Sequence, residues 1–453
     1  MNVLLLHPQF EIYFTHEAPI GLAYLQAVLR EKHDVKILDN NVLNLPIGKI
    51  VQEAKKADAV GISVTTPTFA TVRAIANAIK QETDIPIIVG GAHATIDPKG
   101  CLEFADYAVC GEAEYTFPKL IDALESGNKR TLGKIPGLAY IDKKGKFVRN
   151  ENALIENLDE LPFPDWSGFP LEKYGSVLRT SGRSLPIVTS RGCPYNCIYC
   201  FKGLFGRRFR ARSPENVIAE LKYLKENFQI KEFQIADDAF ATNPNRAIEI
   251  CRKIAENGLG MPWSLPNGIR VGSITDELAC WMKRSGLQYA GLGIESGNQR
   301  ILNRIDKQQT LEQVRKGVAL LKKHKITTVG FFMFGLPEDT EETMRDTVEF
   351  AKSLDLDYYS ISMTTPYPGT RLYDELLSGK GSLLTKTPEE LFSLGSKAKY
   401  IMPGMASAQK TEELYKKARL ELLLRPKTIL RTLKHPKRLI AGAKVAYKWI
   451  VKT

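Results

Sequence analysis

Long uncharged hydrophobic runs are missing from this sequence. No segment reaches the ~18 apolar residues that span a bilayer. The apolar run after Asn2 has only four residues and follows no basic segment, so we expect neither a membrane span nor a cleaved signal peptide. Cysteine is scarce as well: there are seven, and four are dispersed, at Cys101, Cys110, Cys251 and Cys280. We therefore expect a cytoplasmic protein whose dispersed cysteines stay reduced and pack as small hydrophobic side chains.

The composition excludes a disordered or fibrous chain. Hydrophobic residues make up 43% and charged residues 25% of the 453 residues, which is typical of globular proteins, and this length predicts two or three domains. The net charge of +12 is concentrated at one end: from Lys416 to Thr453 there are twelve Lys and Arg residues and one acid, Glu421. The rest of the chain is almost neutral, so the basic character belongs to a C-terminal tail.

Residues 1–126 alternate between short β-branched runs and helical patterns. Strands are predicted at NVLLL, VKILD, AVGISV, IPIIVGG and DYAVCGE, with helices near residues 21–31, 48–57 and 69–83 between them. Such alternation is typical of a parallel sheet covered by helices on both faces. We expect a doubly wound, Rossmann-like α/β domain over residues 1–126.

Ligands of doubly wound sheets bind beyond the carboxyl ends of the strands, where the strand order reverses. Here those ends carry Thr65 and Thr66 after one strand and Gly90 and Gly91 after another. A glycine pair lets the backbone approach a bulky ligand, although glycines at such places also turn the chain without binding anything. These four residues are candidates for a ligand site.

A connector over residues 127–180, with a predicted hairpin in GLAYIDKKGKFVRN, precedes a second alternating region over residues 181–372. Six strand-like runs separated by helical patterns predict a partial parallel barrel of the (β/α)6 TIM type, and residues 373–453 are expected to be helical. The runs lie at 186–190, 232–236, 263–270, 288–294, 326–334 and 358–365. Chemistry in such barrels collects at the carboxyl ends of the strands. The candidates there are Asp237, Asp238, Asn267, Glu295, Ser296, residues 335–340 and residues 366–370.

The stretch RGCPYNCIYC brings three cysteines together. Cys193, Cys197 and Cys200 are spaced CxxxCxxC just after the first predicted barrel strand, and no fourth cysteine is nearby in the sequence. A structural zinc site uses four protein ligands, whereas a [4Fe–4S] cluster held by three thiolates keeps one iron free for a small molecule. The spacing favours the cluster. The alternative from another class is a zinc-binding scaffold or regulatory protein with a solvent ligand on the metal.

With Tyr199 before its last cysteine, this motif resembles the signature of the radical S-adenosylmethionine (SAM) superfamily. FQIADDAF, GLGIESGNQRIL and VGFFMFGLPEDT resemble motifs of its second, fourth and fifth barrel strands. The resemblance implies that SAM chelates the fourth iron of the cluster. The SAM contacts that it implies are Tyr199, Asp238, Glu295, Gly335, Leu336 and Pro337. For the two acids, helix capping or pairing with arginines is the alternative reading.

GLAYLQAVLR, ADAVGISVTTPTF, IIVGGAHATIDP and DYAVCGEAEYTF resemble, in that order, the cobalamin-binding domain of one large branch of these enzymes. The resemblance implies that Thr65, Thr66, Gly90 and Gly91 contact cobalamin. The motif DxHxxG, which supplies a histidine to cobalt in other cobalamin domains, is absent. We therefore expect that any bound cobalt has no histidine ligand, and the fold could also persist without cobalamin.

This branch implies cobalamin-dependent methyl transfer to an unactivated carbon: one SAM methylates reduced cobalamin, and a second yields a 5′-deoxyadenosyl radical that activates the substrate. A cyclase or oxidase without methyl transfer, acting on a lipid or tetrapyrrole-like substrate with or without cobalamin, stays open as an alternative. The implied partners are a reductant such as flavodoxin or ferredoxin and a small-molecule or lipid-like substrate.

The tail offers one more pattern. Lys437, Lys444, Lys448 and Lys452 fall on one stripe of a predicted helix that also carries Trp449. A basic amphipathic helix predicts peripheral contact with an anionic membrane surface, and a plain helix packed on the barrel fits equally well. Nucleic acid is not an expected partner, because aromatic residues are sparse among the basic ones.

Overall fold

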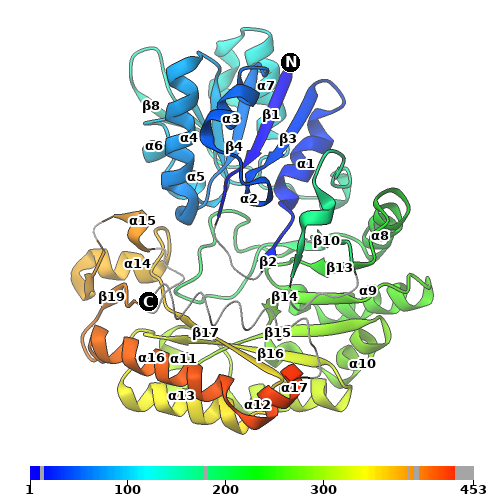
Figure 1. Cartoon of the computed structure of the whole chain (residues 1–453), viewed down its shortest axis with the longest axis vertical. Helices are drawn as coiled ribbons and strands as arrows, with labels where there is room; N and C mark the ends of the chain where they lie inside the picture. The colour runs from blue at the N-terminus through cyan, green and yellow to red at the C-terminus, as the bar shows by residue number, and fades with distance from the viewer. Residues whose placement is uncertain (11–14, 177–181, 386, 392–396, 434–453) are drawn as a thin grey trace. The chain divides into compact units, whose positions relative to one another are not determined.

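The computed structural model describes residues 1–10, 15–176, 182–385, 387–391 and 397–433 (Figure 1). The chain divides into two compact units, the first made mainly of residues up to Tyr174 and the second mainly of residues from Gly175 on. The finer limits expected at residues 126, 180 and 372 stay predictions. Each unit is built around its own sheet, which is mainly parallel in the first unit and wholly parallel in the second.

The first unit holds a seven-stranded sheet in the order β3-β1-β4-β5-β6-β7-β8 (Figure 1). Its strands are β1 (Asn2–His7), β3 (Asp34–Asp39), β4 (Ala59–Ser63), β5 (Ile87–Gly90), β6 (Tyr107–Val109), β7 (Leu138–Ile141) and β8 (Phe147–Arg149). The first five strands in this order are parallel, and β7 and β8 add to β6 as antiparallel neighbours. The predicted α/β fold and the predicted hairpin are confirmed, and the hairpin extends the sheet.

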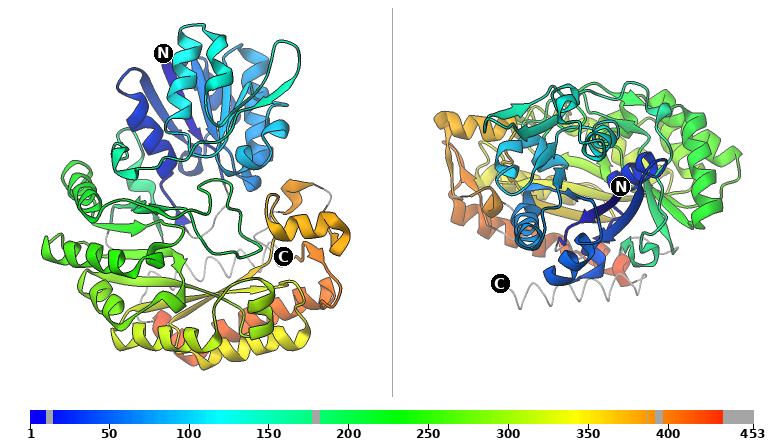
Figure 2. Two further views of the ribbon diagram at one scale, coloured as in Figure 1. Left: turned by 180° about the vertical axis from the view of Figure 1, so that it is seen from behind. Right: turned by 90° about the horizontal axis from the view of Figure 1, so that it is seen from above.

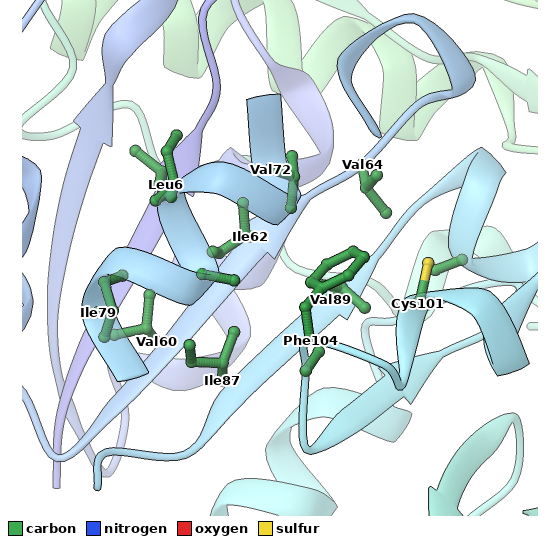
Figure 3. Close-up of a cluster of buried hydrophobic side chains, with 14 of the residues drawn as sticks. Leu6, Val60, Ile62, Val64, Val72, Ile79, Ile87, Val89, Cys101 and Phe104 are labelled. Atoms are coloured by element: carbon green, nitrogen blue, oxygen red, sulfur yellow. The ribbon is translucent and has the colours of Figure 1, made fainter. Parts of the chain in front are cut away.

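Helices cover both faces of this sheet. On one face α3 (Ile47–Ala54) and α4 (Phe69–Glu82) pack over alternate strand residues, and Figure 3 shows Leu6, Ile62 and Val89 in one buried cluster with Val72 of α4. Removing such a side chain from water is worth about 1.5–3 kcal/mol. On the other face, a Cβ at Gly61 would lie 2.8 Å from Phe117 in α7 (Thr116–Glu125). The sheet is therefore buried on both sides, as its continuous apolar runs predict.

The second unit holds six parallel strands in the order β10-β13-β14-β15-β16-β17. They are β10 (Ser184–Ile187), β13 (Glu232–Ile235), β14 (Trp263–Ile269), β15 (Leu287–Glu295), β16 (Thr327–Phe334) and β17 (Tyr358–Met363). Five long helices lie outside this sheet (Figure 2): α8 (Pro214–Phe228), α9 (Pro244–Glu256), α10 (Asp276–Arg284), α12 (Leu311–Lys323) and α13 (Glu341–Ser353). All six predicted strands are present, so the sequence pattern located the barrel correctly. The predicted helix start is also confirmed, since the Ser213 side chain caps α8 by accepting a hydrogen bond from the amide of Asn216.

Two helices end the described part of the chain. In α16 (Ala408–Leu423), the stripe of Thr411, Tyr415, Ala418 and Leu422 is buried, and this helix packs on α13 and β17. A short helix, α17 (Pro426–Leu433), follows it. The predicted lysine stripe at residues 437–452 lies outside the described residues. In the part of the chain that the structure describes, no helix is both long enough and apolar enough to cross a membrane.

Candidate cluster and cofactor site

The cysteine loop follows β11 (Ser190–Arg191) and contains no regular helix. Its anchor is Ile198, which is 1% exposed. The amide of Ile198 donates to the carbonyl of Ile305 at 3.1 Å, and its own carbonyl accepts from the amide of Leu372 at 2.9 Å. Around these anchors Cys193, Cys197 and Cys200 are partly exposed and form no disulfide. The loop therefore presents the three thiols that the motif predicts.

The three thiols are not all within 4.8 Å of one another. Within the described residues, three potential ligand atoms lie within 4.8 Å of one another only at His33, Asp122 and Glu125, in the first unit. Cys193, Cys197 and Cys200 are more widely spread. In an iron–sulfur cluster each thiolate binds a separate iron, so its ligands stand farther apart than the ligands of one zinc ion. Three thiolates on one loop are a donor set that fits an iron–sulfur cluster with one iron left open.

The prediction that the four dispersed cysteines are core residues is confirmed for Cys101, Cys110 and Cys251. Burial raises the pKa of the Cys101 thiol to about 12, of the Cys110 thiol to about 11 and of the Cys251 thiol to about 12. Thiols with such high pKa values do not ionise at neutral pH and are poor metal ligands. Cys280 is only partly buried, in α10.

Two of the predicted SAM contacts meet at the cysteine loop. Burial raises the pKa of the Tyr199 phenol, and the Glu295 carboxyl and the thiols of Cys197 and Cys200 raise it further because they lie nearby. Glu295 ends β15 and pairs with Lys307, with Oε1 2.6 Å from Nζ. Sequence reasoning missed this lysine, which stands just beyond the quoted motif, in IDKQQT.

The neighbouring acids after β13 have different environments. Asp237 is buried and accepts hydrogen bonds of 2.6 Å each from the Thr189 amide, the Thr189 hydroxyl and the Ser190 hydroxyl. Burial raises its pKa, although these bonds oppose the shift. Asp237 thus holds the turn after β10 in place, while the side chain of Asp238 is exposed at the end of the strand. Of the two acids, Asp238 has the position that a ligand contact requires.

The turn after β16 would contact a ligand through its main-chain groups rather than through side chains. Gly335 has φ +69°, Leu336 is 0% exposed, and Pro337 is buried. The buried Asp339 carboxylate accepts from the Leu336 amide at 3.0 Å and from the Thr343 hydroxyl at 2.8 Å. Leu336 packs in a core cluster with Ile198, so it links this turn to the cysteine loop. A ligand at this edge would meet main-chain groups of the turn.

In the first unit the strand order reverses at β1, which lies between β3 and β4. Beyond β4, Thr65 is exposed, whereas the hydroxyl of Thr66 is buried 3.0 Å from Nδ1 of His93. At the end of β5, a Cβ on Gly90 would have its nearest neighbour at 3.7 Å, while a Cβ on Gly91, with φ +111°, would lie 2.9 Å from the Val64 carbonyl oxygen. The four candidates therefore share one edge. Thr66 and Gly91 are tightly packed, and Thr65 forms a capping box with Thr68 although its side chain is exposed. A Cβ at Gly90 would make only ordinary contacts, so Thr65 and Gly90 are the more accessible candidates at this edge.

Comparisons with known families and proteins agree on both units. The sequence matches the family model described as the radical SAM superfamily over residues 187–351 and the B12 binding domain over residues 13–121. It is 36% identical to the uncharacterized methyltransferase PH0819 of Pyrococcus horikoshii, over 95% of this chain and 94% of that protein. It is 29% identical to the anaerobic magnesium-protoporphyrin IX monomethyl ester cyclase of Rubrivivax gelatinosus, over 83% and 70%. The fold is similar to that of the radical SAM methyltransferase TsrM from Kitasatospora setae, with a TM-score of 0.74, 22% identity, and coverage of 89% and 86%.

Proposed function

Because the chain belongs to the radical SAM superfamily and carries a B12-binding domain, we propose that it transfers a methyl group from SAM to an unactivated carbon of a small, lipid-like molecule. The protein is an enzyme whose cofactors are a [4Fe–4S] cluster, SAM and cobalamin. The observation that carries the proposal is the loop of Cys193, Cys197 and Cys200 at the end of the first barrel strand, in a chain that also has a cobalamin domain.

One group of residues holds the cluster, and other groups position SAM and cobalamin. The three thiols hold the cluster, and the backbone of Gly335 to Pro337, with Tyr199 and Glu295, positions SAM beside it. Thr65 and Gly90 would contact cobalamin at the edge of the first sheet. When bound, these groups supply one-electron cleavage of SAM and a cobalt carrier for the methyl group. The protein's own contribution is to orient the ligands and to exclude water.

Methyl transfer is favoured over cyclisation by the similarity to PH0819, since that relative is named a methyltransferase and covers nearly the whole chain. The cyclase of Rubrivivax gelatinosus is less similar but keeps ring formation as the second candidate. Both reactions act on carbon, and both require the same cluster residues. They differ in whether a methyl group from SAM ends in the product.

The test is anaerobic reconstitution of the cluster, followed by incubation with SAM carrying a deuterated methyl group, dithionite, hydroxocobalamin and a lipid extract. Bound corrin is read by absorbance, and 5′-deoxyadenosine and labelled lipids are read by mass spectrometry. We expect bound corrin, 5′-deoxyadenosine and one labelled lipid species. If 5′-deoxyadenosine forms while no corrin binds and no label transfers, methyl transfer must be abandoned in favour of the cyclase or oxidase reading.

The enzyme needs a reductant and acts on a small molecule. We propose that flavodoxin or ferredoxin is the reductant. Replacing dithionite by either purified protein, with its own reductase, should support 5′-deoxyadenosine formation. If neither protein supports more product than the reductase alone, this choice of partner is wrong.

We also propose peripheral contact with anionic membranes through the end of the chain. Five leucines on α16, α17 and the turn between them are more than half exposed: Leu420, Leu423, Leu424, Leu430 and Leu433. Exposed apolar side chains close together in sequence favour an interaction surface, and the exposed Lys416 and Lys417 on α16 carry charge that attracts anionic lipids. Deletion of residues 426–453 should release the protein from anionic liposomes in a sedimentation assay. The membrane proposal fails if the full chain never sediments with them.

A further inference from the structure

A buried ion pair lies beside two of the cluster cysteines. Nζ of Lys307 is 2.6 Å from Oε1 of Glu295, and each side chain is 10% exposed. The Glu295 carboxylate and the thiols of Cys197 and Cys200 lie close enough to Lys307 to act on its charge. The ammonium of Lys307 therefore stands between a carboxylate and two of the cluster cysteines.

The backbone is bent on both sides of this pair. Asp306 and Gln308, which flank Lys307, have φ values of +54° and +53°, and Glu295 has φ +68°. Left-handed backbone is unfavourable for such residues and persists where the surrounding structure requires it. Three such residues around one ion pair indicate that the fold retains an unfavourable backbone conformation because it sets the direction of both charged side chains.

The strand leaves space for the pair. A Cβ on Gly293 would lie 3.0 Å from Oε1 of Glu295 and 3.0 Å from Nζ of Lys307. That distance is tighter than nine in ten contacts of a real Cβ, so a side chain at position 293 would force the two charged groups to shift by a few tenths of an ångström. The small residue in β15 is thus matched to the ion pair.

The same segment is tied to the cysteine loop. The guanidinium of Arg270 donates to the carbonyl of Lys307 at 2.7 Å and stacks on the ring of Tyr195, 4.1 Å from its centroid. Tyr195 stands between the first two cluster cysteines. A second tie is the hydrogen bond from the Ile198 amide to the carbonyl of Ile305. Lys307 is therefore held in register with the thiols.

Stability alone is a weak explanation for this arrangement. Taking two charges out of water costs about as much as their attraction returns, and well-packed hydrophobic residues often do as well or better. The presence of a lysine in a strained segment next to the cluster cysteines therefore points to a role other than stability. Its positive charge and its ion pair with Glu295 indicate what that role is.

We propose that Lys307 is a positioning residue of the cluster and SAM site, whose ammonium fixes the Glu295 carboxylate and offsets its negative charge beside Cys197 and Cys200. This inference rests on the proposed function, because it requires the cluster to bind these cysteines. Lys307 occupies Oε1 and leaves Oε2 of Glu295 for a hydroxyl or ammonium group of SAM. By cancelling the carboxylate charge, it favours the reduced state of the cluster, which carries one more negative charge.

The test compares the reconstituted wild-type enzyme with Lys307→Met, Lys307→Arg and the double variant Glu295→Gln/Lys307→Met. The midpoint potential is measured by EPR-monitored titration, and the SAM dissociation constant by equilibrium dialysis. A pH of about 8.5 keeps an unpaired carboxylate ionised. For Lys307→Met we expect about a tenfold smaller equilibrium constant for one-electron reduction, which is 59 mV, and SAM binding weaker by about tenfold.

The other variants separate charge from packing. Lys307→Arg should keep the potential, because the cation remains. The double variant should recover the potential, because both charges are gone, while SAM binding stays weak because the oriented carboxylate is lost. Lys316→Met, on the exposed face of α12, is the matched control and should behave as wild type.

Two results would overturn the inference. One is a Lys307→Met enzyme with wild-type potential and SAM affinity. The other is a double variant whose potential stays as low as that of Lys307→Met, since charge compensation predicts recovery. If the wild-type enzyme itself assembles no cluster, the proposed function fails instead, and the iron content of each preparation distinguishes the two cases.

Discussion

The hydroxyl of Tyr400 donates a hydrogen bond of 2.6 Å to the carbonyl oxygen of Gly335. Tyr400 is 2% exposed and lies on β19 (Tyr400–Ile401), far along the chain from the turn that follows β16. The bond joins the segment after the barrel to the backbone that we assign to SAM. It fixes the direction of a peptide group at φ +69°, where no helix or strand would hold it.

Tyr400→Phe should therefore weaken SAM binding several-fold and lower the melting temperature. The Gly335 carbonyl would be left buried without its donor, which costs roughly 1–3 kcal/mol. SAM affinity by equilibrium dialysis and thermal unfolding check the two effects. Tyr415→Phe, which removes the hydrogen bond from Arg419 on α16, is the control and should leave SAM affinity unchanged. Equal loss of affinity in both variants would contradict the assignment.

Asp339 makes the same turn sensitive to pH. Burial raises the pKa of its carboxyl to about 7, against hydrogen bonds from Thr343 and the backbone that lower it. The folded protein then holds a proton that the unfolded chain releases near pH 4. The corresponding stability is present at low pH and is lost as the pH rises through about 7.

Asp339→Asn removes this titration while keeping an oxygen that accepts from the Leu336 amide. We expect the melting temperature of the wild-type protein to fall more between pH values of about 5 and 7 than that of the variant, because in this range the folded state holds a proton that the unfolded chain has lost. Parallel thermal curves of both proteins across this range would show that Asp339 stays ionised in the folded state.

Much of the fold follows from local pattern. The strands of both sheets are continuous apolar runs between helices with polar faces, and such runs can be located without knowing their neighbours. The cysteine loop was predictable for a different reason, since its three ligands lie within eight residues, Cys193 to Cys200. The spacing of the cysteines along the sequence was therefore enough to predict a cluster site.

The missed features depend on contacts between distant residues. Lys307 becomes significant only because Glu295, twelve positions earlier, turns toward it. Asp237 and Asp238 are identical in type and adjacent, yet the first is buried against the hydroxyls of Thr189 and Ser190 and the second is exposed. Gly90 and Gly91 form one pair in the sequence, but only the second has left-handed backbone. No pattern along the chain distinguishes these cases.

The left-handed backbone at Gly91 and its absence at Gly90 predict opposite outcomes for substitutions at these two neighbouring positions. Gly91→Ala should destabilise the first unit by about 1–3 kcal/mol, because alanine is strained at φ +111° and its Cβ would strike the Val64 carbonyl. Gly90→Ala should leave the melting temperature nearly unchanged. If Gly90 contacts cobalamin as proposed, however, corrin binding should fall at least tenfold.

Corrin absorbance after gel filtration measures the binding, and Gly48→Ala is the control, since its new Cβ has no neighbour within 4 Å. Undiminished corrin binding by Gly90→Ala would remove this residue from the cobalamin site. A stable Gly91→Ala protein would mean that the turn after β5 can relax.

Replacing one cluster thiol should remove the cluster without unfolding the chain. Cys197 is partly exposed on a loop held by the backbone of Ile198, so Cys197→Ala should keep the fold. We expect iron content after reconstitution to drop to a small fraction of the wild-type value, together with loss of 5′-deoxyadenosine formation. Cys280→Ala, also a partly buried cysteine, should retain both. Bound zinc in place of iron in the wild-type protein would instead favour the scaffold reading.

The buried ion pair between Arg212 and Glu220 should be a major stability determinant of the barrel. Arg212 is 4% exposed and Glu220 is 0% exposed at their side chains. Burial raises the pKa of Glu220, and Arg212 opposes that shift.

Arg212→Met would leave the carboxylate without its cation, which costs about 3–5 kcal/mol. Arg252→Met serves as the control, because the pair of Arg252 with Glu249 is on the surface of α9 and such pairs contribute little. Urea unfolding should show a large loss for the first variant and almost none for the second. The double variant Arg212→Met/Glu220→Gln should recover part of the loss, since the stranded charge is gone. A loss that persists in full would assign the effect to the packing of the arginine side chain rather than to its charge.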